Sequence, residues 1–171
     1  MTAGAHTKAV LALGSNLGER AGTLQSAVAD LVDRPEVRLL NVSPVVQTKP
    51  VGGPAGQPDF LNMVIAVETT LDPYELLAHC HAVEQAHDRV RDVRWGARTL
   101  DVDIITYGDW TSTDPVLTVP HPRAAARAFV LYPWSLMEPA AVLAGHPVAE
   151  LAAAAPDMAG IEHADTDQAQ L

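Results

Sequence analysis

The chain of 171 residues lacks several features that would place it in common protein classes. Its single cysteine, Cys80, excludes an intramolecular disulfide and is typical of a reducing compartment, so we expect a cytoplasmic location. Since no apolar run approaches the length that crosses a bilayer and the N-terminus has no signal-peptide pattern, we expect no membrane association. The two common glycine-rich phosphate-binding motifs, Gly-x-x-x-x-Gly-Lys-Ser/Thr and Gly-x-Gly-x-x-Gly, are also missing, so any nucleotide would be bound by another design.

Basic residues are scarce as well. The chain has 11 Lys and Arg against 21 Asp and Glu, a formal net charge of −10. This charge disfavours general nucleic-acid binding, which depends on a basic surface to displace counterions. More than half of the basic residues nevertheless lie in one stretch of the sequence: they are Arg89, Arg91, Arg94, Arg98, Arg123 and Arg127. An acidic chain that gathers its arginines in this way is suited to a small polyanion.

Asp101 and Asp103 follow the first four of these arginines, two residues apart in a run with β-strand character. Side chains at i and i+2 of a strand point to the same face, so the two carboxylates should project together. The residues between and beside them, Leu100, Val102 and Ile104, should then turn into the core. Two like charges side by side favour a bound cation, and Mg²⁺ is commonly held by one or two carboxylates together with substrate phosphates. Taken alone, the pair is equally consistent with an acidic strand facing solvent.

A charged loop at 88–97, which contains Trp95, leads into this strand. Guanidinium groups form forked hydrogen bonds with phosphate oxygens, and phosphoryl transfer depends mainly on positioning and charge stabilisation. The loop and the strand together therefore have the parts that phosphoryl transfer needs. The alternative is an ordinary solvated surface on which Asp88 and Asp92 pair with the arginines.

Aromatic residues make up only 5% of the chain, and Phe60 and Phe129 are its two phenylalanines. Phe60 and Asn62 are two apart on an expected strand, so they should share a face that would suit a flat heterocycle. Core packing is the ordinary alternative for both phenylalanines. His121, fixed between two prolines, could contact a phosphate, although a histidine in a surface turn is the simpler interpretation.

Three histidines on one expected helix, His79, His81 and His87, suggest a metal site at first sight. His79 and His81 would lie about 200° apart around the helix axis, so they cannot share a ligand. His81 and Glu84, three residues apart, could do so. A solvated helix face explains these residues more simply.

The hydrophobic periodicity predicts the element order β-α-β-β-α-β. The expected strands are 8–13, 37–47, 60–69 and 98–107, and the expected helices are about 19–31 and 71–87, with Asp72 as the N-cap of the second. A short strand at 116–119, a partly helical segment at 123–137 and a helix near 148–154 follow. This order is typical of a ferredoxin-like α+β sandwich, a mainly antiparallel sheet with helices packed on one face and the other face free to carry a site. We expect one domain over 1–171, with a core at about 8–138 and flexible ends at 1–6 and about 158–171.

Six sequence blocks, in a fixed order over about residues 8–138, carry a resemblance to a known family. The blocks are Leu13-Gly-Ser-Asn-Leu-Gly18, Pro58-Asp-Phe-Leu-Asn62, Arg89-Val-Arg91, Arg94-Trp-Gly-Ala-Arg-Thr-Leu-Asp-Val-Asp103, Leu117-Thr-Val-Pro-His121 and Arg127-Ala-Phe-Val-Leu131. Together they resemble the 2-amino-4-hydroxy-6-hydroxymethyldihydropteridine pyrophosphokinase (hydroxymethyldihydropterin pyrophosphokinase) family. Each block alone would be weak evidence, whereas their joint occurrence is specific.

The resemblance implies an enzyme that transfers pyrophosphate from ATP to the hydroxymethyl group of 6-hydroxymethyl-7,8-dihydropterin, releasing AMP, in folate biosynthesis. It implies two Mg²⁺ ions held by Asp101 and Asp103, and ATP as co-substrate. The implied catalytic residues are Arg89, Arg98, Asp101 and Asp103, and the implied nucleotide-binding residues are Glu84, Arg91, Trp95, Thr118, His121 and Arg127. Phe60 and Phe129 would sandwich the pterin ring, with Asn62 and the backbone from Thr48 to Val51 at its polar edge. We expect small-molecule substrates, with no nucleic acid, membrane or obligate protein partner.

Three residues depart from the usual pattern of that family. Ala97 stands where proline is normal, Asp88 where glycine is normal, and His81 where glutamine is common. These changes bear on loop closure and ATP affinity. Two other functions stay open: a ferredoxin-like module that binds a small ligand without catalysis, and an RNA-binding domain of similar topology, which the net charge of −10 disfavours.

Overall fold

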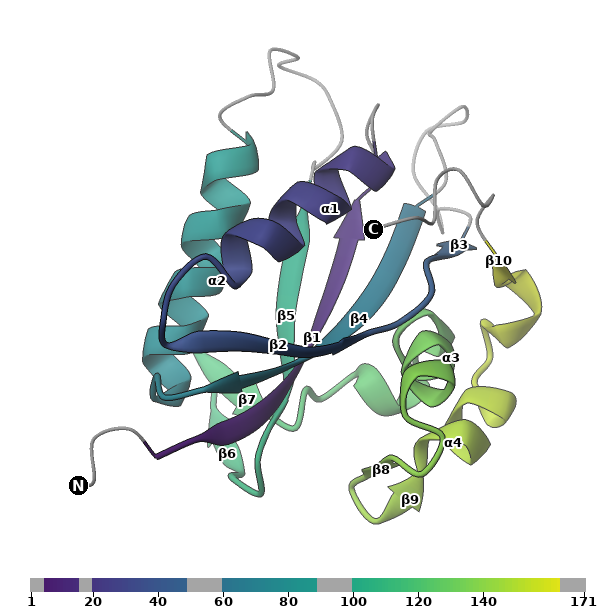
Figure 1. The fold of residues 1–171 in the computed structure, drawn as a ribbon. Helices are drawn as coiled ribbons and strands as arrows, with labels where there is room; N and C mark the ends of the chain where they lie inside the picture. Colours follow the sequence, from purple (N-terminus) through teal and green to yellow (C-terminus); the bar gives the residue numbers. More distant parts are fainter. Residues whose placement is uncertain (1–4, 16–19, 49–59, 89–99, 164–171) are drawn as a thin grey trace.

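The computed structural model describes residues 5–15, 20–48, 60–88 and 100–163 (Figure 1). The first elements are β1 (Thr7–Ser15), α1 (Arg20–Leu31), β2 (Val37–Val42), β3 (Val46–Thr48), β4 (Phe60–Thr69), α2 (Pro73–Asp88) and β5 (Asp101–Tyr107). They are followed by β6 (Ser112–Asp114), β7 (Leu117–Val119), α3 (Ala128–Met137), β8 (Val142–Leu143), β9 (His146–Pro147), α4 (Val148–Ala154) and β10 (Glu162–His163), with 3-10 turns at Ala124–Ala126 and Met158–Gly160. In these ranges no helix is both long and apolar enough to span a membrane.

The main sheet has the strand order β10-β3-β4-β1-β5, and β2 pairs with the far end of β4. Every pairing recorded in it is antiparallel, which confirms the predicted α+β class with a mainly antiparallel sheet. Strand β4 and helix α4 have the predicted bounds, and the predicted N-cap of α2 is confirmed. The Asp72 side chain accepts a hydrogen bond from the Glu75 backbone, and the Glu75 side chain accepts one from the Asp72 backbone, a reciprocal capping box.

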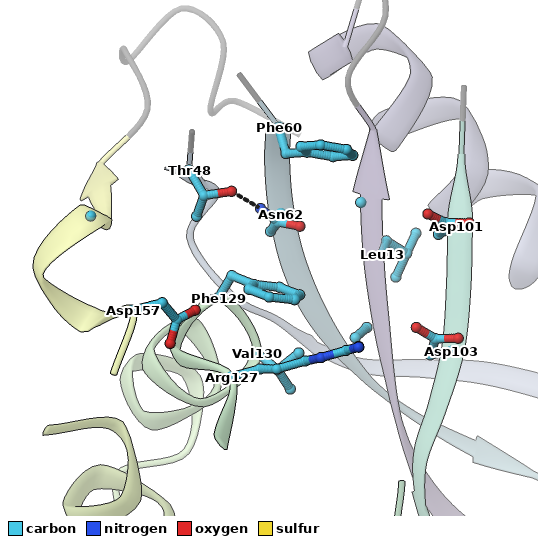
Figure 2. Close-up of a pocket in the computed structure, with 13 residues that line it drawn as sticks. Leu13, Thr48, Phe60, Asn62, Asp101, Asp103, Arg127, Phe129, Val130 and Asp157 are labelled. Atoms are coloured by element: carbon cyan, nitrogen blue, oxygen red, sulfur yellow. Dashed lines mark hydrogen bonds between the residues drawn. The ribbon is translucent and has the colours of Figure 1, made fainter. Parts of the chain in front are cut away.

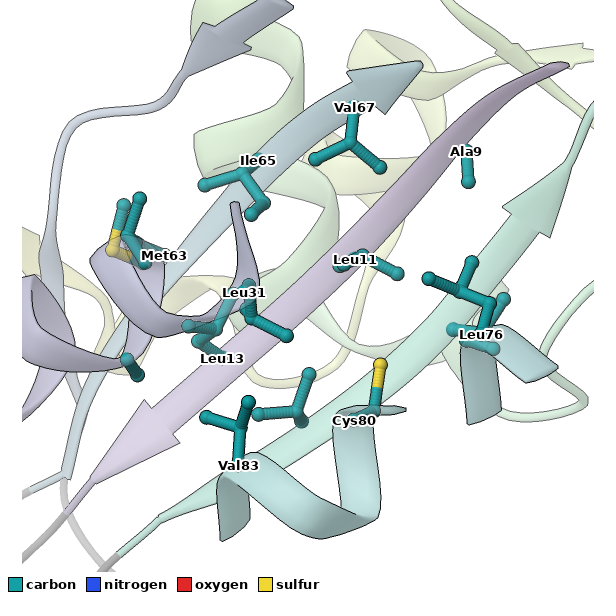
Figure 3. Close-up of a cluster of buried hydrophobic side chains, with 14 of the residues drawn as sticks. Ala9, Leu11, Leu13, Leu31, Met63, Ile65, Val67, Leu76, Cys80 and Val83 are labelled. Carbon is teal, nitrogen blue, oxygen red and sulfur yellow. The ribbon is translucent and has the colours of Figure 1, made fainter. Parts of the chain in front are cut away.

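One face of the sheet packs against α1 and α2 (Figure 3). The odd-numbered residues of β1 and β4 point to this side because side chains alternate along a strand. They include Leu11 and Leu13 of β1 and Ile65 of β4, all of which are almost fully buried. Cys80 of α2 lies in the same cluster. This layer is the helical layer that the sequence predicts.

The opposite face carries a second hydrophobic cluster, which the sequence did not indicate. Here Val10 of β1, Val64 of β4 and Ile105 of β5 pack with Leu131 of α3 and Val148 of α4. Helices α3 and α4 therefore cover part of the face that the sequence analysis left free, on the other side of the sheet from α1 and α2 (Figure 1).

The chain after α4 adds to this second layer. Met158 and Ile161 pack against the cluster, and β10 pairs with β3 at the sheet edge. Residues 158–163, which the sequence analysis assigned to a flexible tail, form a 3-10 turn and this short strand instead. Apolar side chains spaced among polar ones anchor the segment, although its composition suggested disorder.

Candidate active site

A cavity of about 490 Å³ opens on the part of the sheet face that α3 and α4 leave uncovered (Figure 2). Its walls come from the strands of the main sheet, including the end of β3, from the start of α3 and from the segment after α4. The lining residues are Ala12, Leu13, Gly14, Thr48, Phe60, Asn62, Asp101, Asp103, Arg127, Phe129, Val130, Asp157 and Gly160.

The sheet register explains the floor of the cavity. Gly14 of β1 lies opposite Asn62 of β4 on one side and Asp101 of β5 on the other. In the next row of this face, Ala12 lies opposite Asp103. The two small residues on β1 thus make a shallow trough between the amide and the carboxylates. A Cβ atom at Gly14 would lie 2.8 Å from Asn62 Oδ1, so any side chain there would displace the Asn62 amide.

Asp101 and Asp103 both line this trough, and Figure 2 shows their carboxylates on the same side of β5. The residues that alternate with them, Leu100, Val102 and Ile104, are at most 3% exposed. The predicted alternation is therefore confirmed. An acidic strand facing open solvent does not describe the pair, because it lies at a cavity wall.

The two phenylalanines reach the cavity from different elements. Phe60 comes from β4 and Phe129 from α3, and Figure 2 shows both rings directed into the cavity with open space between them. At the same end, Asn62 Nδ2 donates a hydrogen bond of 3.0 Å to Thr48 Oγ1, which fixes the orientation of the amide. Two aromatic faces beside a polar edge suit a flat heterocycle with hydrogen-bonding groups on its rim. Core packing alone does not explain rings that line an open space.

Arg127 and His121 supply positive charge and a hydrogen-bond donor near the carboxylates. The Arg127 guanidinium carbon lies 5.5 Å from the centroid of the Phe129 ring, within cation–π range, and Figure 2 shows the side chain extending toward Asp103. Burial lowers the pKa of His121, Asp103 opposes that effect, and Arg127 and Arg123 add to it. His121 Nδ1 accepts a hydrogen bond from the Arg123 backbone, so the neutral ring carries its proton on Nε2.

Glu84 holds the backbone of β5 instead of lining the cavity. Its Oε2 accepts a 2.7 Å hydrogen bond from the backbone N–H of Val102, the residue between the two aspartates. Burial raises the pKa of Glu84, the hydrogen bond from Val102 opposes this, and the Asp101 charge adds to the rise. Glu84 therefore acts on the carboxylate pair through the strand that carries it.

The cavity brings together seven of the residues that the sequence singled out: Thr48, Phe60, Asn62, Asp101, Asp103, Arg127 and Phe129. Glu84 and His121 are not part of its lining. Thr118 lies in a separate depression with Ser112 and Thr113, where its hydroxyl donates to the Asp114 carbonyl. Val51, Arg89, Arg91, Trp95, Ala97 and Arg98 lie outside the described residues, as does the side chain of Asp88.

Asp157 and Gly160 line the cavity from a part of the chain in which the sequence analysis named no site residue. They follow α4, in a segment with no recognisable motif. The only available signal was an acidic residue after the last predicted helix, and nothing local to it indicates a contact with a site 29 residues earlier.

The carboxylates of Asp101 and Asp103 determine which kind of metal ion the site could bind. Among the described residues, no group of three or more His, Cys, Asp or Glu side chains could hold a metal ion. Asp101 and Asp103 supply two carboxylates on one face, which matches Mg²⁺ only where other oxygen ligands, such as substrate phosphates, complete its shell. The donor set thus fits a metal that arrives with a polyphosphate better than a resident structural metal.

Residues 10–139 match the family model described as 7,8-dihydro-6-hydroxymethylpterin-pyrophosphokinase. The chain is similar to the 2-amino-4-hydroxy-6-hydroxymethyldihydropteridine pyrophosphokinase of Pseudomonas aeruginosa, with 46% identity over 153 residues that cover 89% of this chain and 93% of that one. It is also similar to the protein of that name from Methylorubrum extorquens, with 40% identity over 159 residues that cover 93% of this chain and 99% of that one.

Two longer proteins contain a similar part. The bifunctional protein FolKE of Lactococcus lactis is 42% identical over 123 residues, which cover 35% of its length. Among solved structures, the Plasmodium falciparum HPPK-DHPS A437G protein with pteroate matches 87% of this chain and 43% of its own, with a TM-score of 0.67 and 15% identity. At that identity the likeness concerns the fold alone.

Proposed function

The chain belongs to the 7,8-dihydro-6-hydroxymethylpterin-pyrophosphokinase family, and from this premise we propose how its residues carry out the reaction. The reaction transfers the pyrophosphate group of ATP to the hydroxymethyl oxygen of 6-hydroxymethyl-7,8-dihydropterin, with AMP as the leaving group. We propose that residues 1–171 act as one cytoplasmic domain on these small molecules, without an obligate protein partner.

The pterin ring lies between Phe60 and Phe129 in this proposal. The observation that carries it is the placement of both rings and both aspartates around one cavity (Figure 2). A ring stacked between the phenylalanines would present its polar edge to Asn62 and Thr48, which are already joined by a hydrogen bond. Its hydroxymethyl group would then be directed across the Gly14 trough toward the carboxylates.

Asp101 and Asp103 are proposed to hold two Mg²⁺ ions. When bound with ATP, these ions would neutralise phosphate charge and favour phosphoryl transfer by electrostatic stabilisation. Glu84 supports this role, since its hydrogen bond to the Val102 N–H fixes the backbone between the two carboxylates.

The remaining charged groups are proposed to bind the phosphates. Arg127 keeps its positive charge at any relevant pH and extends toward Asp103, so it can offer a forked donor at the mouth of the carboxylate pair. His121 offers its Nε2–H as a neutral donor. Thr118 is proposed as a nucleotide contact. Arg89 and Arg98 are proposed for the phosphates, and Arg91 and Trp95 for the nucleotide site, on the resemblance of their two sequence blocks alone.

The test is a direct nucleotide assay. The purified protein is incubated with ATP, MgCl₂ and 6-hydroxymethyl-7,8-dihydropterin, and the nucleotides are separated by chromatography. We expect one AMP for each pterin consumed. ADP in place of AMP, or no turnover beside an active control enzyme, would contradict the proposal.

Asp101→Asn and Asp103→Asn separate catalysis from binding alone. Each substitution keeps the side-chain shape and removes a charge, so we expect turnover to fall by at least about a hundredfold while the pterin Kd stays within about threefold. Asp109→Asn, in the exposed turn after β5, is the matched control and should keep wild-type turnover. Full activity of Asp101→Asn and Asp103→Asn would contradict their proposed role in metal binding. A wild-type protein that binds the pterin but forms no AMP would be a binding module and not an enzyme.

A further inference from the structure

The start of α3 carries the cavity residues Arg127, Phe129 and Val130, and it depends on a distant side chain for its cap. The helix begins at Ala128, between Arg127 and Phe129, both of which line the cavity. Arg127 occupies the N-cap position but has no hydrogen-bond acceptor in its side chain, and it makes no capping bond. The first backbone N–H groups of a helix have no partner within the helix, so they need an acceptor from elsewhere.

Asp157 supplies that acceptor. Its Oδ1 accepts a 2.9 Å hydrogen bond from the backbone N–H of Ala128, and the carboxylate also lines the cavity beside Phe129 (Figure 2). A negative charge at this position interacts favourably with the positive end of the helix dipole. The bond therefore joins the segment after α4 to the residue between Arg127 and Phe129.

Neighbouring residues of its own segment restrict the position of Asp157. Ala152 and Ala155, just before it, are buried against the α3 layer, and the Asp157 carbonyl accepts a hydrogen bond from the Gly160 backbone. Ala128 is itself fully buried, so its backbone has little freedom on the other side of the bond. The contact thus connects a fully buried residue of α3 with a segment that the buried Ala155 anchors.

We propose that Asp157 is a positioning residue for the pterin site. Its carboxylate fixes the first turn of α3 so that the Phe129 ring keeps the orientation needed to stack on the substrate. The matched family model ends at residue 139, so this role falls to a part of the chain beyond it. The inference rests on the proposed function, in which the pterin lies between Phe60 and Phe129.

The test compares variants that keep or remove the acceptor, with 6-hydroxymethyl-7,8-dihydropterin as the probe. Asp157→Ala removes the acceptor, so we expect the pterin KM and Kd to rise about tenfold, the scale of one lost hydrogen bond, while kcat stays within about twofold. Asp157→Asn keeps an oxygen at the same place and should restore the pterin KM to within about twofold of the wild type.

Asp72→Ala is the matched control for a purely structural cap. Asp72 also caps a helix with its carboxylate, here α2 and from the adjoining N-cap position, through a 2.8 Å bond from the Glu75 N–H, and it is not among the residues that line the cavity. We expect both alanine variants to lower Tm, but only Asp157→Ala to change the pterin KM. An unchanged pterin KM in a folded Asp157→Ala protein would overturn the proposal.

The proposal can still be tested if Asp157→Ala does not fold or if the wild type forms no AMP. If Asp157→Ala does not fold, Asp157→Glu replaces it as the test variant, because it displaces the carboxylate by one methylene group. An unchanged pterin KM in Asp157→Glu would equally overturn the proposal. If the wild type forms no AMP, the proposed function fails, and the pterin Kd of wild type and variant decides whether Asp157 orders the cavity.

Discussion

Glu84 shows how one residue can serve the site from behind it. The family resemblance implies a nucleotide contact for Glu84, and in the structure its carboxylate accepts a hydrogen bond from the Val102 N–H between the two aspartates. Burial raises the pKa of Glu84, so the ionised form is disfavoured in the folded protein relative to the unfolded chain. The Glu84 side chain stabilises the fold as a hydrogen-bond acceptor for Val102, whereas its buried negative charge lowers the free energy of unfolding.

This gives a prediction for Glu84→Gln and Glu84→Ala. Gln keeps an oxygen for the Val102 N–H without the charge, so at pH 7 its free energy of unfolding should be within about 1 kcal/mol of the wild type. Ala leaves that N–H without its acceptor and should cost roughly 1–3 kcal/mol. Urea unfolding measures both values, and equal losses in Gln and Ala would contradict the assignment.

The direction of the Glu84 pKa shift predicts how the stability difference between wild type and Glu84→Gln changes with pH. A carboxyl group whose pKa is raised by folding contributes stability below its unfolded pKa and loses that contribution as pH rises through its folded pKa. The ordinary value here is 4.5, so the wild type should gain stability relative to Glu84→Gln as pH falls from 7 toward 4.5. A difference that is independent of pH over this range would show that the Glu84 charge has no cost.

At the scale of elements, the chain bends between β2 and β3, where the sequence predicts one continuous strand (Figure 1). The predicted strand 37–47 is divided into β2 and β3, which pair with different parts of β4. Ser43 makes the join: its N–H donates to the Val64 carbonyl, and its hydroxyl accepts from the Val64 N–H, each at 2.8 Å. The hydroxyl replaces the ladder carbonyl that the bend removes, and β3 can then bring Thr48 to the cavity.

Ser43→Ala should therefore destabilise the protein more than its size suggests. Val64 is fully buried, so its N–H would lose its acceptor without gaining water, at a cost of roughly 1–3 kcal/mol in the free energy of unfolding. Ser135→Ala is the control, because its hydroxyl only donates to the Tyr132 carbonyl within α3, and the loss there should be below about 0.5 kcal/mol. Equal losses in denaturant unfolding would contradict the role of Ser43.

At the scale of the whole molecule, two hydrophobic clusters lie on opposite faces of one sheet. Only the first was expected, since alternating residues of β1 and β4 predict burial but do not tell which helices cover which face. The second cluster leaves part of its face open, and that uncovered part is where the cavity lies. The position of the site thus depends on how far α3 and α4 extend over the sheet.

The lone cysteine reports on this packing. Cys80 is fully buried in the first cluster, and burial raises its pKa to about 12. Since the thiolate is the reactive form, we expect a disulfide reagent such as DTNB at pH 8 to label native protein no faster than it unfolds, and urea-unfolded protein at once. Cys80→Ser provides the unlabelled control. Full labelling within seconds in native buffer would show that this cluster opens without global unfolding.

The sequence by itself determined what depends on near neighbours. The shared face of Asp101 and Asp103, the bounds of β4 and the cap at Asp72 follow from alternation and from hydrogen bonds within a few residues, so local patterns predict them. The resemblance of its blocks likewise identified the family, because its motifs are short and ordered. Tertiary structure decided the contacts between distant segments: Asp157 with Ala128, and Glu84 with Val102. These contacts arise from the packing of whole elements, and no local pattern specifies which buried N–H a distant carboxylate will reach.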